Sequence, residues 1–182
     1  MDPSNTETPL DALLLELNSR GYEGLSEEKD EALFAAYRSV CDRVVSKAME
    51  ACDEGEPWPE RIRSGLKVLL DLLSAKPDMA RALTRSFPGI RPATYQCYVD
   101  LLARFLPAMQ AGRDYSGVDE ELPSEVELMA VGAAEAIIFV ELDAGRADRL
   151  PRMLPEILFS ILVPFIGPER AAEEMQSAAA TP

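Results

Sequence analysis

The chain has 182 residues, of which 47% are hydrophobic, so it is long and apolar enough for one globular domain with a substantial core. Its formal net charge of -14 opposes binding to nucleic-acid phosphates, and its lack of histidine removes the commonest general base and the usual zinc ligands. Three cysteines are too few for a disulfide framework, no apolar run approaches the roughly 18 residues of a membrane span, and the polar start lacks the order of a signal peptide. We therefore expect a cytoplasmic protein with no catalytic activity, no bound metal or other cofactor and no membrane contact.

Two helices are predicted at the start of the chain, and they follow each other directly. Residues 9–26 form a short amphipathic helix that Gly21 closes, and Glu27 opens a second helix at once. The second helix continues to about Cys52, because apolar residues recur at i, i+3, i+4 and i+7 for about five turns. Residues 1–56 hold five Lys or Arg against fourteen Asp or Glu, so this part of the chain has a local charge of -9 and would repel phosphate.

Proline marks the boundaries of the predicted middle helices. Pro57 and Glu60 lie at the start of a third helix, where proline is tolerated and a carboxylate faces the positive end of the helix dipole. Pro77 ends that helix and opens a short one that extends to about residue 86. A long helix from about residue 93 to residue 111 then carries a broad apolar face, and a polar loop follows at residues 112–121.

Two helices are predicted in the last third of the chain. The first, at residues 123–142, contains a run of small residues at 130–136 that lets another helix approach closely. The second carries an uncharged apolar stripe over residues 150–166, in which Pro155 and Pro164 should bend the helix or mark its ends. The stripe is wider than one neighbouring helix covers, so it lies at the centre of the fold or packs against a second chain. No sustained alternation of apolar and polar residues occurs, so the chain is predicted to be all-α.

Several segments resemble, in order, parts of the TetR family of bacterial transcriptional regulators. LDALLLELNSRGYEGLS is similar to the first helix and turn of that family, and KDEALFAAYRSV to the start of its regulatory core. PWPERIRSGLKVLLDLLSAKPDMARAL and VGAAEAIIFVELDAGRADRLPRMLPEILFSILVPFIGPERA resemble later helices of the core, with similar length, order and spacing. The helix-turn-helix that the family places between the first two segments is missing from this sequence.

The resemblance implies an all-α bundle of about seven to eight helices that forms a homodimer through its last two long helices and holds a small-molecule cavity. It divides the chain into a remnant of a DNA-binding headpiece (residues 1–26), a ligand-binding and dimerisation domain (27–176) and a flexible tail (177–182). The expected function is sensing of a small, mostly apolar ligand without DNA binding, as a homodimer or as a heterodimer with a full-length regulator. Two alternatives stay open: a DNA-binding repressor with a shortened or truncated head, and an interaction protein with a fully packed core.

The candidate ligand-binding residues are bulky or partly polar side chains on the inner faces of several predicted helices. They are Tyr37, Cys41, Trp58, Ile62, Leu66, Met79, Leu83, Phe87, Tyr95, Tyr98, Phe105, Met109 and Met129. Each has a plainer explanation as a core residue, because aromatic and Met side chains at helical spacing usually pack in a core. For Trp58, which two prolines flank, a structural role at the start of a helix is the better explanation.

The candidate dimer interface combines the small-residue run with the apolar stripe. Its residues are Ala130, Ala133, Ala134, Ile137, Ile138, Leu150, Met153, Leu154, Ile157, Leu158, Ile161, Leu162 and Phe165. Acidic residues indicate no competing site. Glu135 and Glu141 are six positions apart on one helix and do not face each other, and the acidic runs at 27–31 and 119–121 lack the spacing of a calcium loop.

Overall fold

A computed structural model of the chain describes residues 27–52, 56–88, 92–115 and 122–180. Every regular element in these ranges is helical, which confirms the all-α prediction. In chain order the elements are α2 (Glu27–Glu50), α3 (Trp58–Ala75), α4 (Pro77–Arg81), the π-helical turn η2 (Ala82–Ser86), α5 (Pro92–Ala103), α6 (Leu106–Tyr115), α7 (Val126–Asp143), the 3-10 helix η3 (Ala147–Met153) and α8 (Leu154–Ala180). Six of the α-helices in these ranges have ten or more residues, slightly fewer than the seven to eight helices predicted. The helix expected at residues 9–26 lies outside the described residues.

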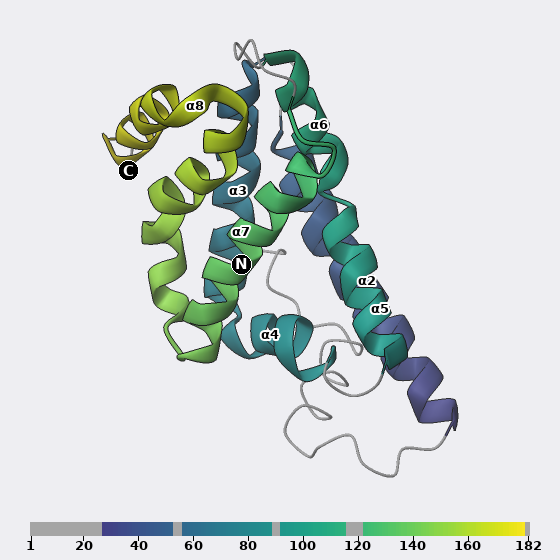
Figure 1. The fold of residues 1–182 in the computed structure, drawn as a ribbon. Coiled ribbons are helices and arrows are strands. Elements are labelled where there is room, and N and C mark those ends of the chain that lie inside the picture. Colours follow the sequence, from purple (N-terminus) through teal and green to yellow (C-terminus); the bar gives the residue numbers. More distant parts are fainter. Residues whose placement is uncertain (1–26, 53–55, 89–91, 116–121, 181–182) are drawn as a thin grey trace.

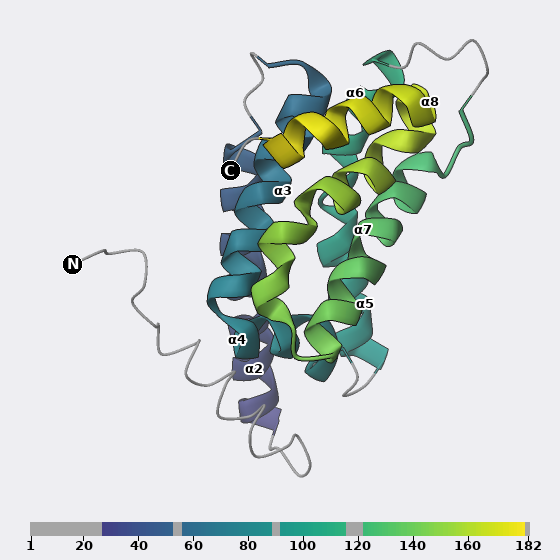
Figure 2. The same ribbon diagram turned by 90° about the vertical axis from the view of Figure 1, so that its left-hand side faces the viewer.

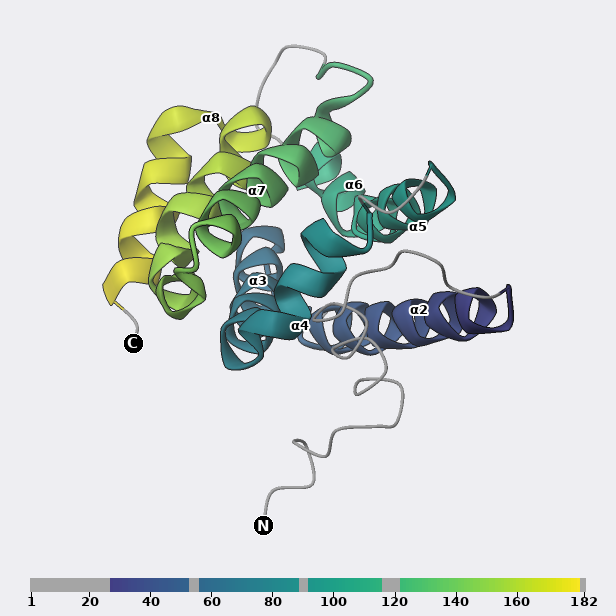
Figure 3. The same ribbon diagram turned by 90° about the horizontal axis from the view of Figure 1, so that it is seen from below.

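Helix α3 packs against several other elements along one side (Figure 1), and its other side keeps Ser64, Lys67 and Asp71 exposed. It contacts α2, α4, α6, η3 and α8. Helix α7 lies beside α8 and α2 lies beside α5, so that these two pairs flank α3. Seen from below, the N-terminal end of α2 projects beyond the other helices (Figure 3).

The buried apolar residues form two separate clusters. The main core joins α3, α6, α7, η3 and α8, and includes the fully buried side chains of Leu70, Leu150, Ile157 and Phe165. The minor core joins α2 to the α4–η2 segment and comprises Leu33, Ala36, Tyr37, Val40, Cys41, Met79, Ala82, Leu83 and Phe87. Each large aliphatic side chain buried in this way contributes about 1.5–3 kcal/mol relative to exposure, so both clusters hold their helices together.

The long helix predicted at about residues 93–111 is divided into two helices, and Pro107 is the physical reason. Proline has no backbone N–H, and its ring clashes with the carbonyl four residues earlier, which here belongs to Ala103. Helix α5 ends at Ala103, and the chain passes through a turn at Arg104 and Phe105 before α6 begins. The polar loop predicted from residue 112 was therefore placed too early, because α6 continues to Tyr115.

Helix α8 changes direction sharply at Gly167. The backbone there has φ 78° and ψ 164°, a region that glycine alone adopts readily, and Pro168 follows. After this turn, the second part of α8 crosses one end of the bundle (Figure 2). Pro155 is the second residue of α8, as expected of a proline that marks a helix end, whereas Pro164 lies inside the helix without ending it.

The last turns of α8 correct the predicted flexible tail (177–182) over residues 177–180, and residues 181–182 lie outside the described residues. The helix continues to Ala180, and the side chain of Ala178 is 4% exposed and belongs to the main core. Alanine has the highest helix propensity of all residues, so a run of alanines that also packs against a core remains helical. The low complexity of this segment therefore does not indicate disorder for residues 177–180.

The segment Ala147–Ala180 is long and apolar enough to cross a membrane, judged by length and composition alone. Its apolar side chains have another explanation in this fold, because Ile157, Leu158, Ile161 and Leu162 are buried in the main core. The turn at Gly167 also divides α8 into two parts, each shorter than the roughly 20 residues of a membrane span. The segment is therefore better explained as a core helix of the bundle.

Candidate functional site

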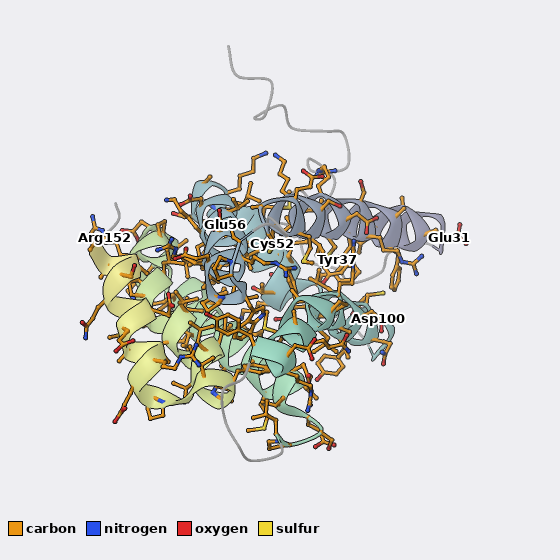
Figure 4. All side chains as sticks on the ribbon, turned by 90° about the horizontal axis from the view of Figure 1, so that it is seen from above. Glu31, Tyr37, Cys52, Glu56, Asp100 and Arg152 are labelled. Carbon is orange, nitrogen blue, oxygen red and sulfur yellow. The ribbon has the colours of Figure 1, made fainter. Side chains whose placement is uncertain are left out.

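An apolar cavity of about 130 Å³ lies between the main core and the minor core. Side chains from α2, α3, η2, α5, α6 and α7 build its wall, and Ile161 of α8 contributes to it. In Figure 4, Cys52 of this wall lies beside the end of α2 that meets α3, whereas Glu31 lies at the projecting end. An engineered apolar cavity of about 150 Å³ in another protein binds benzene, so this cavity has room for a compact apolar group.

Small residues from several helices contribute to the wall of the cavity. Ala48, Gly65, Ala108 and Ala134 line it from four different helices. Gly65 also lets α2 and α3 approach closely, since a Cβ atom there would lie 2.5 Å from Cys52 Sγ and 2.9 Å from the Ala48 carbonyl oxygen. The short side chains leave a space that their larger neighbours do not fill.

Seven of the predicted ligand-binding residues line this cavity. They come from α2, α3, η2, α5, α6 and the turn before α6: Cys41, Ile62, Leu66, Leu83, Tyr98, Phe105 and Met109. The structure therefore brings together side chains that lie up to 68 positions apart in the sequence, between Cys41 and Met109. Whether they contact a ligand stays a prediction.

Three other predicted residues lie in the minor core instead. The rings of Tyr37 and Phe87 stack with their centroids 3.8 Å apart, and the Tyr37 hydroxyl donates a hydrogen bond of 3.1 Å to the Leu83 carbonyl. Met79 is buried in the same cluster. These side chains do not line the cavity; they pack behind its wall at Leu83.

The remaining three predicted residues also lie away from the cavity. Tyr95 and Met129 are 59% and 60% exposed, so the inward orientation expected for them was wrong. Trp58 is buried, and its Nε1 donates a hydrogen bond of 2.9 Å to the Ala108 carbonyl while its ring packs edge to face against Phe165. Trp58 thus ties α3 to α6 and α8, which is the kind of structural role that its flanking prolines favoured.

The residues of the wall that the sequence interpretation missed are mostly small or aliphatic. They are Val44, Ala48, Met49, Cys52, Gly65, Leu69, Leu73, Thr84, Leu101, Leu102, Ala108, Val131, Ala134, Glu135, Ile138 and Ile161. The apolar periodicity of the helices identifies the inner faces on which most of them lie. It does not distinguish a side chain at a void from one in solid packing.

Two polar side chains meet in the cavity wall. The Tyr98 hydroxyl on α5 donates a hydrogen bond of 2.6 Å to Glu135 Oε1 on α7. Burial, and then this hydrogen bond to a carboxylate, raise the pKa of Tyr98, so the hydroxyl keeps its proton and remains a donor. The Cys41 thiol also lines the cavity, and burial raises its pKa to about 12, so it is a neutral thiol rather than an activated nucleophile.

Two carboxylates whose pKa values are lowered by arginine partners connect structural elements. Arg113 on α6 forms a bidentate ion pair with Glu127 on α7, and hydrogen bonding to Arg113 lowers the pKa of Glu127. Arg146 likewise binds both oxygens of Glu141, each at 2.8 Å, and lowers the pKa of that carboxyl. No group of three or more Cys, Asp or Glu side chains that could hold a metal ion occurs among the described residues.

Most of the predicted dimer-interface residues lie inside the core of a single chain. Ala130, Ala134, Ile138, Leu150, Leu154, Ile157, Leu158, Ile161, Leu162 and Phe165 are buried, and Ala133, Ile137 and Met153 are half-buried. The apolar stripe over residues 150–166 is wide because α8 packs against both α3 and α7. A central position in the fold therefore explains its width, without a second chain. The exposed large apolar side chains of α7 are different ones, namely Leu128, Met129 and Val140.

Comparisons of the chain with protein-family models, with curated proteins and with solved structures found no match. The likeness to TetR regulators therefore rests on the sequence segments alone. The geometry of the cavity and the exposed face of α7 are the structural features that bear on function.

Proposed function

We propose that this protein is a cytoplasmic, TetR-like regulatory core that senses a small, mostly apolar molecule in the cavity and does not bind DNA by itself. The observation that carries the proposal is the cavity between the two cores. A bundle packed only for stability has few voids larger than a water molecule, whereas this one accommodates a group of about the size of benzene. A mostly apolar wall with a few placed polar groups, here the Tyr98–Glu135 pair, is typical of small-molecule sites.

Homodimerisation is the second part of the proposal, and the exposed face of α7 supports it. Leu128, Met129 and Val140 lie on one side of the helix together with the exposed small residues Gly132 and Ala136, since these positions recur every three or four residues. Exposed apolar side chains that gather on one face are typical of a protein interface. Two copies of this face related by a two-fold axis would cover each other, and a full-length regulator would use the same face in a heterodimer.

The charge of the chain is the reason for leaving DNA binding out of the proposal. Residues 1–56 carry a local charge of -9, and the whole chain carries -14. A DNA-binding surface neutralises phosphates with Lys and Arg, and the affinity falls steeply with salt for that reason. An acidic chain of this kind would need a concentrated basic patch, and residues 1–56 have only five basic side chains.

Native mass spectrometry of the freshly purified chain tests the proposal, because it weighs the assembly and any retained ligand together. We expect a dimer mass with additional small-molecule mass, and uptake of toluene by calorimetry once the retained molecule has been removed. Operator-length DNA in moderate salt should give no complex, whereas a salt-sensitive complex would favour a DNA-binding repressor. A monomer without added mass and without toluene uptake would reject the proposal in favour of an interaction protein.

A further inference from the structure

Glu135 is the one charged side chain among the described residues that line the cavity. The other polar groups of the wall are the hydroxyls of Tyr98 and Thr84 and the thiols of Cys41 and Cys52. No Lys or Arg of the described residues contributes to the wall. The carboxylate would therefore repel an anionic ligand, and no positive charge in the wall would offset that repulsion. A cationic ligand would instead be attracted to the carboxylate.

The Tyr98 hydroxyl holds this carboxylate in place and leaves part of it available. The hydrogen bond from α5 to Oε1 is 2.6 Å long, and no described residue donates a hydrogen bond to Oε2 or forms an ion pair with Glu135. The other polar groups have partners of their own. Thr84 Oγ1 donates to the Ala80 carbonyl at 3.0 Å, and Cys52 Sγ donates to a backbone carbonyl at 3.4 Å. Glu135 Oε2 thus belongs to a residue of the wall and is an acceptor that no described donor occupies.

We propose that the cavity selects small organic cations, in which a primary or secondary ammonium group binds Glu135 and a compact apolar body fills the cavity. This inference rests on the proposed function, in which the cavity is the ligand site. A charge-assisted hydrogen bond is roughly twice as strong as a neutral one. The volume of about 130 Å³ limits the apolar body to about one aromatic ring. The net charge of -14 also raises the concentration of cations near the protein.

Calorimetric titration of the full chain with toluene, benzylamine and benzoate tests this inference, since the three probes share one ring and differ in charge. We expect benzylamine to bind at least about tenfold more tightly than toluene, because its hydrogen bond to the Glu135 carboxylate adds to the contribution of the ring that both probes share, and we expect no binding of benzoate. In Glu135→Gln, which keeps the shape and an oxygen that accepts the Tyr98 hydrogen bond, the preference for benzylamine should disappear while toluene still binds. The matched control is Glu156→Gln on the exposed side of α8, which makes the same charge change outside the cavity and should keep the preference.

The outcomes separate this inference from the proposed function. Equal affinities for benzylamine and toluene, or preferred binding of benzoate, would overturn the choice of cations and leave a ligand-sensing cavity in place. A preference that survives Glu135→Gln, or that falls equally in Glu156→Gln, would place the cation on the surface and would also overturn the inference. If none of the probes binds to the wild-type chain, both the inference and the cavity-based function are wrong.

Discussion

Replacement of Gly112 by alanine should destabilise the protein, even though alanine favours helices. Gly112 lies inside α6, and a Cβ atom there would lie 2.6 Å from Cζ2 and 2.8 Å from Cη2 of Trp58, and 2.9 Å from Cδ1 of Phe165. Neither ring moves freely, because the Trp58 indole is hydrogen-bonded to the Ala108 carbonyl at 2.9 Å and the two rings pack with their centroids 4.9 Å apart. Overpacking of this kind costs about 1–3 kcal/mol.

The matched control is Gly132→Ala on α7, where an added Cβ meets no atom within 4 Å. This variant should gain up to about 1 kcal/mol, because glycine is the poorer helix former. The gain in helix propensity is common to both variants. The difference between their free energies of unfolding therefore measures the packing cost at Gly112, which we expect to be about 1–3 kcal/mol.

Urea unfolding followed by circular dichroism gives both free energies, and measurement at two protein concentrations detects any contribution from association through α7. Equal stability of the Gly112→Ala and Gly132→Ala variants would refute the packing argument. A second variant tests the cause directly. Trp58→Phe removes the two nearest ring atoms, so its effect and that of Gly112→Ala should be less than additive when they are combined.

Four further substitutions give testable expectations. Tyr37→Phe keeps the ring but loses the 3.1 Å hydrogen bond to a backbone carbonyl, so the free energy of unfolding should fall by about 1 kcal/mol; an unchanged value would mean that this bond contributes nothing. Ala134→Leu should fill part of the cavity, abolish toluene binding and raise the melting temperature. The gain in the free energy of unfolding has an upper limit of about 3 kcal/mol, which corresponds to complete filling of about 130 Å³. Hydrogen bonding to its arginine partner lowers the pKa of Glu127 in the folded protein. The stabilisation by Glu127 is therefore present above its unfolded-state pKa and is lost as the pH falls through its folded-state pKa. In urea unfolding, the Glu127→Gln variant should accordingly lose less stability than the wild type when the pH is lowered. Val140→Glu on the exposed face of α7 should convert a dimer into a monomer in sedimentation experiments, and a dimer that persists would place the interface elsewhere.

The helices could be predicted from the sequence wherever periodicity and helix-ending residues agree. The start of α3 after Pro57 and the start of α4 at Pro77 follow from proline, and α2 follows from a long apolar face. The sequence interpretation overlooked Pro107, although the same rule predicts the break there. The turn inside α8 is at Gly167 and not at Pro164, because the required backbone conformation has a positive φ that proline does not adopt.

The candidate site was harder to predict, because a cavity depends on what the opposing helices leave empty. Bulky inward residues such as Ile62 and Met109 were found by their spacing, and they do line the cavity. Ala48 looks in the sequence like an ordinary helix residue, and Ala134 was interpreted as part of a close helix contact rather than as a residue that leaves space. The position of Tyr98 opposite Glu135 depends on how α5 packs against α7, which no local pattern encodes. Periodicity is also ambiguous at the edge of an apolar face, and Tyr95 and Met129 fall on the exposed side of that edge.

The void between the two cores also has a consequence for the cooperativity of unfolding. Side chains on either side of it lack the dispersion contacts that elsewhere join one part of an interior to the next. Around the void, the coupling between the main core and the minor core, which α2 and the α4–η2 segment hold, therefore depends on the direct packing of α2 against α3. A molecule in the void would touch both clusters at once and so add to the contacts through which the two cores unfold together.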